Sequence, residues 1–153
     1  MHKIRREDRT IIADDAFEIL KNAEFGILST VDKENQPYGV PLSFCVYNKN
    51  IYFHCAKEGY KINNLDSNSK VSFCVVGNTK ILPDQFSTNY ESTIVFGRAE
   101  EVFDDEKYKA LEQLIFKYSK DFFEEGVKYI NASKENTKVY KISIEFISGK
   151  ARK

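Results

Sequence analysis

The stretch that decides the fold is Pro37–Leu65, which reads Pro-Tyr-Gly-Val-Pro-Leu-Ser-Phe-Cys-Val-Tyr (37–47), Asn-Lys-Asn (48–50), Ile-Tyr-Phe-His-Cys-Ala (51–56) and Lys-Glu-Gly-Tyr-Lys-Ile-Asn-Asn-Leu (57–65). Apolar side chains alternate through 37–47, the period of two that is typical of a strand. The polar triplet 48–50 predicts a hairpin turn to a second strand over 51–56, followed by a short helix. Pro41 has no N–H to give to a sheet, so the first strand is expected at an edge or to be irregular there.

The same stretch places a free sheet edge beside cationic residues. An edge strand leaves backbone N–H and C=O groups without partners in the sheet. Lys57 and Lys61 lie at the expected start of the short helix, where free N–H groups and the positive end of the helix dipole favour an anion. A flat, polar-rimmed ligand that carries a phosphate, such as flavin mononucleotide (FMN), would suit this combination.

The whole-chain composition narrows the function classes. At 153 residues and 42% hydrophobic content, the chain is expected to fold as a single domain over 1–153. Lysine plus arginine and aspartate plus glutamate both number 23, and this balance argues against nucleic-acid binding. No signal-peptide core and no membrane-length apolar run occurs, and the three cysteines have no C-x-x-C spacing. We therefore expect a cytoplasmic protein that binds no membrane.

The segments on either side of Pro37–Leu65 alternate short strands with a few helices. Their patterns predict helices over 14–23 and from 104 onward, a weaker helix over 120–130, a polar loop over 78–91, and strands over 25–31, 70–77, 92–102 and 139–147. The apolar run 70–77 is expected at the centre of the sheet. Short strands joined by turns predict a mainly β fold of the α+β class, a six-stranded antiparallel sheet that closes into a small barrel with flanking helices.

His54 is the side chain with the most chemical promise. The sequence lacks G-x-G-x-x-G, Walker A and G-x-S-x-G patterns, and its two histidines, His2 and His54, exclude a multi-histidine metal site, so no metal is expected. On alternation His54 shares a face with Tyr52 and Ala56, which puts it toward a partner, a cofactor or water. Two plainer interpretations stay open: a structural histidine at a strand end, and lysines that only decorate a solvated helix face.

Six segments together carry a resemblance to a known family. They are Gly-Ile-Leu-Ser-Thr (26–30), Gln-Pro-Tyr-Gly-Val-Pro-Leu-Ser-Phe (36–44), Ile-Tyr-Phe-His-Cys-Ala-Lys-Glu-Gly-Tyr-Lys-Ile (51–62), Lys-Val-Ser-Phe-Cys-Val-Val-Gly (70–77), Tyr-Glu-Ser-Thr-Ile-Val-Phe-Gly-Arg-Ala (90–99) and Ser-Gly-Lys-Ala-Arg-Lys (148–153). In their order and spacing they resemble the nitroimidazole-resistance branch of the pyridoxamine phosphate oxidase-like flavoproteins. The similarity covers nearly the whole chain.

This resemblance implies a split β-barrel and a homodimer that holds FMN in a cleft between its subunits. It puts the strand residues Val40, Pro41, Leu42 and Ser43 along the isoalloxazine edge. It puts Lys61 by the phosphate, with Lys57 and Tyr60 nearby, and makes His54 a reactive or cofactor-proximal group. Lys150 and Arg152 belong to the tail that such proteins bring near the flavin. Many relatives carry histidine where this chain has Tyr60, which would not titrate near neutrality.

The function expected from the residues and the resemblance is that of an FMN-dependent oxidoreductase. Its substrates would be small flat acceptors, either aromatic or nitro compounds such as nitroimidazoles. Two alternatives stay open at this point. One is a pyridoxamine phosphate oxidase-like enzyme, which would need further basic contacts for a second phosphate. The other is a non-catalytic module that only binds a flavin or another small molecule.

Overall fold

The computed structural model describes residues 3–153, and His2 lies outside them. Its helices are α1 (Ala13–Asn22), α2 (Tyr60–Ser67), α3 (Asp104–Tyr118) and α4 (Phe123–Ser133). Its strands are β1 (Thr10–Ile11), β2 (Gly26–Val31), β3 (Pro37–Leu42), β4 (Cys45–Tyr47), β5 (Asn50–Cys55), β6 (Lys70–Leu82), β7 (Ser87–Val102) and β8 (Lys138–Arg152).

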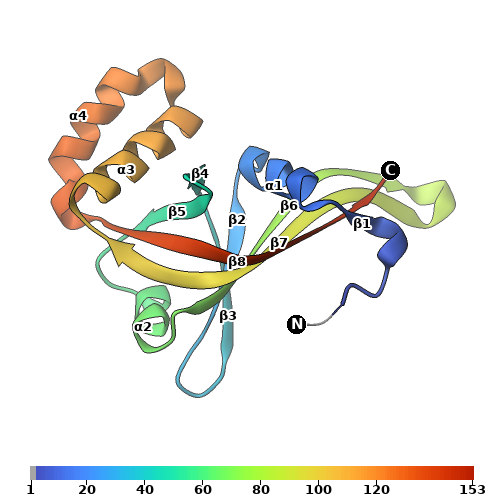
Figure 1. The fold of residues 1–153 in the computed structure, drawn as a ribbon. Coiled ribbons are helices and arrows are strands. Elements are labelled where there is room, and N and C mark those ends of the chain that lie inside the picture. The colour runs from blue at the N-terminus through green and yellow to red at the C-terminus, as the bar shows by residue number, and fades with distance from the viewer. Residues whose placement is uncertain (1–2) are drawn as a thin grey trace.

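The strands form one antiparallel sheet in the order β3-β2-β6-β7-β8-β5-β4, with β1 added against β8 (Figure 1). This confirms the predicted fold class, an antiparallel sheet with flanking helices. The strand count differs because the expected strand 37–47 is interrupted at Ser43–Phe44 and because β1 adds a short pairing. The two outermost strands, β3 and β4, are thus separated by only two residues in the chain. The sheet must curl to bring them together, and it stays open between them.

Two local predictions within the opening stretch are confirmed. The β4–β5 hairpin turns on Asn48 and Lys49, whose φ values of 48° and 62° are those of a tight two-residue hairpin turn. The strand that contains Pro41 pairs with β2, and within residues 3–153 it pairs with no other strand, so it is an edge. The apolar strand β6 lies between β2 and β7, the expected central position.

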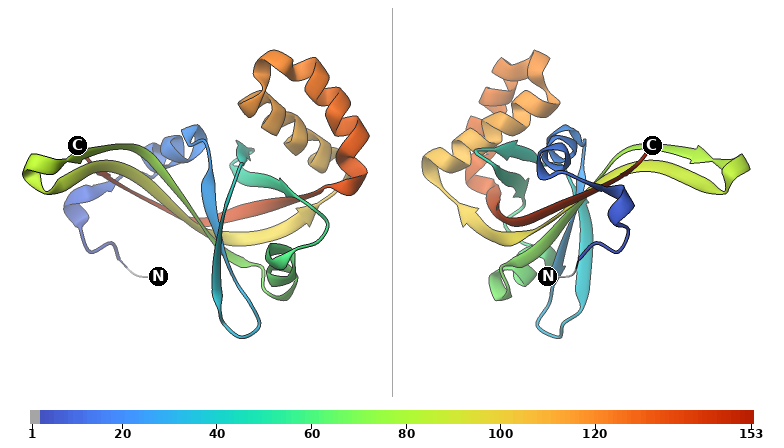
Figure 2. Two further views of the ribbon diagram at one scale, coloured as in Figure 1. Left: turned by 180° about the vertical axis from the view of Figure 1, so that it is seen from behind. Right: turned by 45° about the vertical axis from the view of Figure 1, so that its right-hand side comes forward.

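The prediction of a polar loop over 78–91 is wrong. These residues prolong β6 and β7 into a long hairpin arm, in which Thr79–Leu82 pair with Ser87–Tyr90 around a short turn at Pro83–Gln85 (Figures 1 and 2). Much of the arm is exposed on both faces, and the Phe86 side chain at its tip is 96% exposed. Because no core lies against one face of the arm, its residues are not alternately apolar and polar, and the usual sequence signal of a strand is missing.

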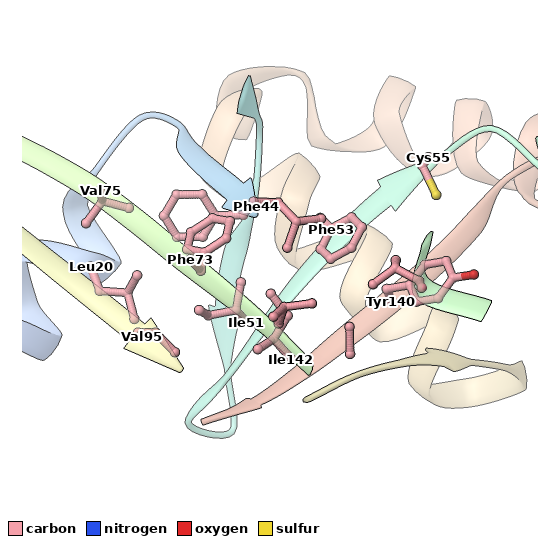
Figure 3. Packing of buried hydrophobic residues seen from close by; sticks show 14 of the residues in the cluster. Leu20, Phe44, Ile51, Phe53, Cys55, Phe73, Val75, Val95, Tyr140 and Ile142 are labelled. Carbon is pink, nitrogen blue, oxygen red and sulfur yellow. The ribbon is translucent and has the colours of Figure 1, made fainter. Parts of the chain in front are cut away.

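The hydrophobic core has two parts, one inside the curled sheet and one beneath the helical pair. Phe44, Phe53 and Phe73 are fully buried inside, and the rings of Phe44 and Phe73 meet edge to face with centroids 4.9 Å apart (Figure 3). On the other face of β5, Tyr52 is buried with residues of α3 and α4, and its hydroxyl donates to Glu106 Oε1 at 2.8 Å. Strand β5 is therefore buried on both faces until it reaches His54.

Candidate functional site

Two open edges of the sheet border the candidate site. Strand β3 pairs only with β2 along Pro37–Leu42. The last residues of β5, Phe53–Cys55, pair only with β8, because β4 begins at Cys45, opposite Tyr52. Both stretches therefore have backbone donors and acceptors that no neighbouring strand in residues 3–153 takes up. Along β3 and just beyond it, the half-buried Val40 and Leu42 pack against the core, while Pro41 and Ser43 are exposed.

Helix α2 follows β5 directly and presents an uncapped, cationic N-terminus. Its N-cap is Gly59, whose φ of 147° lies in the region that favours glycine, and no side chain there bonds to the free N–H groups. The first turn of α2 carries no acidic residue, whereas the first turns of α1, α3 and α4 all do. Lys61 in this turn is half-buried, with Nζ 6.0 Å from the centroid of the Phe53 ring. The helix end thus favours an anion.

Two hydrogen bonds fix α2 against the β2–β3 hairpin. The Tyr60 hydroxyl donates to Asp32 Oδ2 at 2.8 Å, and the Tyr60 ring meets Tyr38 of β3 edge-on at 4.7 Å. One turn later the buried Asn64 donates from Nδ2 to Thr30 Oγ1 at 3.0 Å. The bond to Asp32 raises the pKa of Tyr60, so the phenol stays neutral. Tyr60 therefore holds α2 against the β2–β3 hairpin. A contact between Tyr60 and a phosphate stays a prediction.

His54 lies at the end of β5, on the outer face and beyond the cover of α3. It pairs with Val139 of β8, and its side chain is exposed. Partial burial of the ring, and then the positive charge of Lys61, lower the pKa of His54 from its ordinary value of 6.5. The neutral imidazole is favoured at neutral pH. Burial also raises the pKa of the neighbouring Cys55 thiol, with Lys61 acting in the opposite direction.

The remaining predicted residues fall in two places. Lys57 is exposed in the bend between β5 and α2, close in sequence to Lys61. Lys150 and Arg152 are ordered in β8, opposite Ser92 and Tyr90 of β7, at the arm end of the sheet and away from α2 (Figures 1 and 2). Within one chain, Lys61 lies close enough to His54 to lower its pKa, and the neighbouring Tyr60 meets Tyr38 of β3. Lys150 and Arg152 lie at the arm end of the sheet instead (Figure 1).

Sequence reasoning missed the residues that hold this site in shape. Asp32 lies in the polar segment 32–36 between two predicted strands, and Asn64 lies in the predicted short helix, and neither is singled out. Asn64 is buried although it does not share the helix face of Ile62 and Leu65, so the helical period does not indicate its burial. Nothing local in the sequence indicates that Tyr60 reaches Asp32, because the two residues are 28 positions apart.

Two further properties of residues 3–153 bear on function. None of their helices combines the length and the apolar character needed to cross a bilayer. Within the same range, no three side chains of the His, Cys, Asp and Glu types gather where they could hold a metal ion.

Comparisons with known proteins give one family match and several structures of similar fold. The family model described as pyridoxamine 5'-phosphate oxidase matches residues 13–151. No curated protein matches the chain. Among solved structures, a candidate 5-nitroimidazole antibiotic resistance protein from Bacteroides thetaiotaomicron is 27% identical with a TM-score of 0.75, over 98% of this chain and 95% of that one.

Two other solved structures share the fold. A FAD-binding protein from Mesorhizobium loti is 24% identical with a TM-score of 0.68, over 95% of this chain and 98% of that one. A FAD and heme binding protein from Mycobacterium smegmatis is 16% identical with a TM-score of 0.83, over 96% of this chain and 74% of that one. The matched region spans β2 to β7, including the edge strand β3, as well as α2 and β8 up to residue 151, one residue short of the end of that strand. The chain belongs to the pyridoxamine 5'-phosphate oxidase family.

Proposed function

We propose that this protein is an FMN-dependent oxidoreductase that reduces small flat acceptors, nitroimidazole-like compounds among them. The observation that carries the proposal is the N-terminus of α2. It is uncapped, lacks carboxylates in its first turn, and carries Lys61 beside two open sheet edges. A monophosphate would accept hydrogen bonds from this helix end and from Lys61, with Lys57 close by. The similarity to a candidate 5-nitroimidazole antibiotic resistance protein supports the acceptor class.

The donor set fits the ring of a flavin as well as its phosphate. The pyrimidine rim of an isoalloxazine needs backbone donors and acceptors, which the free edge along Val40–Ser43 offers. The half-buried Val40 and Leu42 would contact the apolar part of the ring. When bound, a flavin itself supplies the electron-transfer chemistry, and the protein binds, orients and surrounds it. The neutral His54 could accept or donate one hydrogen bond near the substrate without adding charge.

The proposal includes a homodimer with FMN between its subunits. Within one chain, Lys150 and Arg152 lie at the arm end, away from Lys61, so they could reach the same flavin only from a second chain (Figure 1). The outer face of β6, β7 and β8 supports such contact. Ile94 and Phe96 are 40% and 41% exposed there, and Phe96 stacks on Phe146 with centroids 5.8 Å apart. An apolar sheet face of this kind is typical of a subunit interface.

The test begins with the visible spectrum of the purified protein. Titration of flavin-free protein with FMN, FAD and riboflavin should give tight binding of FMN and weak binding of riboflavin, which has no phosphate. Mixing the FMN-loaded protein with reduced nicotinamide and a nitroimidazole should then consume the nitro compound. A protein that neither is yellow nor binds added FMN overturns the proposal.

Two other results would select the alternatives. FMN binding without turnover of any acceptor would favour a flavin-binding module. Steady conversion of pyridoxamine phosphate to pyridoxal phosphate would favour a pyridoxamine phosphate oxidase, the enzyme for which the family is named.

A further inference from the structure

The break between β3 and β4 leaves one buried residue outside the sheet ladder. Phe44 is fully buried, yet neither strand includes it. Its backbone N–H and C=O groups need partners, because unpaired buried polar groups are costly. Because of this break, β3 ends at Leu42, and Ser43 follows outside the strand.

Two consecutive side chains at the end of α3 provide those partners. The Phe44 N–H donates to the Tyr118 hydroxyl oxygen at 3.0 Å, and the Lys117 ammonium donates to the Phe44 carbonyl at 2.9 Å. The same Lys117 Nζ donates to the carbonyl of Ala23 at 2.7 Å, and the Tyr118 hydroxyl donates to the carbonyl of Glu24. The break is thus tied to the segment that joins α1 to β2.

The packing around Lys117 matches this role. Its Nζ lies 3.8 Å from the centroid of the Phe44 ring, a distance at which a cation is attracted to the ring face. The Phe44 ring in turn packs on Phe73 inside the sheet. Side chain and backbone of Phe44 are therefore both held from α3. Such contacts fix the direction in which the chain leaves β3.

We propose that Lys117 and Tyr118 form a clamp on the β3–β4 break, and that this clamp positions the Val40–Ser43 edge for the flavin. The second half of the proposal rests on the proposed function, whereas the first half concerns the flavin-free chain. Neither side chain is assigned a contact with the cofactor. Both act through the backbone of Phe44, so they are positioning residues rather than catalytic ones.

The first experiment uses hydrogen exchange on the flavin-free protein. Tyr118→Phe removes the oxygen that accepts from the Phe44 N–H, and exchange of that amide should become about tenfold faster or more because the opened state is no longer opposed by the bond. Tyr129→Phe is the matched control, because Tyr129 is 71% exposed on α4 and its hydroxyl makes no hydrogen bond to other residues of 3–153. Equal exchange in the two variants would overturn the clamp.

The second experiment measures the FMN dissociation constant well below the unfolding temperature. Lys117→Met keeps the aliphatic stem and removes the ammonium that donates to the carbonyls of Ala23 and Phe44. It should weaken FMN binding about fivefold or more, because the Val40–Ser43 edge is then held less firmly. Lys120→Met is the matched control, because Lys120 contacts Phe116 and not the break. Lys117→Arg should restore most of the affinity, since a guanidinium can still donate to both carbonyls.

A variant with lowered stability separates positioning from plain stabilisation. Ile130→Val trims a buried residue of α4 in the second part of the core, away from β3. It should lower the unfolding temperature without changing FMN affinity. If Lys117→Met and Ile130→Val change affinity equally, or if exchange at Phe44 quickens with no loss of FMN affinity, the positioning role is wrong. If the unaltered protein binds no flavin, the proposed function fails and the exchange result still decides the clamp.

Discussion

Replacing Lys61 by methionine should weaken FMN binding through the phosphate alone. Methionine keeps an apolar stem beside Phe53, over whose ring the Lys61 ammonium lies at 6.0 Å, so packing at the end of β5 changes little. A hydrogen bond to a charged group contributes about 1.5–3 kcal/mol, which corresponds to a roughly tenfold to hundredfold rise in the FMN dissociation constant. The free N–H groups of α2 remain, so binding should not be abolished.

Riboflavin provides the internal control for this prediction. It has the same ring and lacks the phosphate, so its affinity should be the same for Lys61→Met and for the unaltered protein. Lys49→Met is the matched control variant, since Lys49 is exposed in the β4–β5 turn, at the other end of β5 from His54. Quenching of flavin fluorescence measures all of these affinities in one format.

The flavin-free protein gives an independent check on where Lys61 lies. Partial burial of the ring is the larger cause of the lowered pKa of His54, and the positive charge of Lys61 is the second. Lys61→Met should therefore raise the pKa of His54, which NMR titration of its ring protons would follow, and Lys49→Met should not. Equal losses for FMN and riboflavin, or an unchanged His54 titration, would refute the reasoning.

Three further predictions follow from other parts of the structure. Gly97→Ala should destabilise the fold by about 2–4 kcal/mol in urea unfolding. A Cβ at this position, where the β7–β8 register shifts, would lie 2.2 Å from the Ser143 carbonyl oxygen. An unchanged unfolding midpoint would contradict this prediction. Phe96→Glu should convert the proposed dimer to a monomer in analytical ultracentrifugation, whereas Phe86→Ser at the arm tip should leave the proposed dimer intact. Burial lowers the pKa of Lys117 from 10.5 to about 8, so between these values the unfolded chain holds a proton that the folded chain has released, and stability from this group rises with pH. The rise between about pH 8 and 10 should be smaller in Lys117→Met, and an equal slope would argue against the lowered pKa.

The sequence predicts those parts of the fold whose signals are local. Pro41 indicates an edge strand because a missing N–H has the same consequence in any context. The alternation in β5 correctly puts Phe53 in the core. It also groups Tyr52 with His54 on a face expected to meet a partner, a cofactor or water, yet Tyr52 is buried by α3. That cover depends on how a distant helix packs, which period-two reasoning does not contain.

The parts that the sequence does not predict depend on pairing between distant segments. The arm residues 78–91 form strands because the backbone of the β6 segment pairs with that of the β7 segment, although much of both faces is exposed to solvent. Lys150 is expected in a tail near the flavin, yet it lies in β8 and is paired on both sides, with β1 and with β7. At the site, Lys61 and His54 could be selected from the sequence, whereas Asp32, Asn64 and Lys117 act over long separations and leave no local pattern.

Pro41 also has a consequence for the behaviour of this protein at high concentration. An uncovered strand margin is a template on which further chains can add, the route by which folded proteins polymerise into fibrils. A proline one residue before the end of β3 interrupts the regular row of amide donors that an incoming strand would need. The margin can therefore offer hydrogen bonds to a small molecule and still resist continuation by another polypeptide.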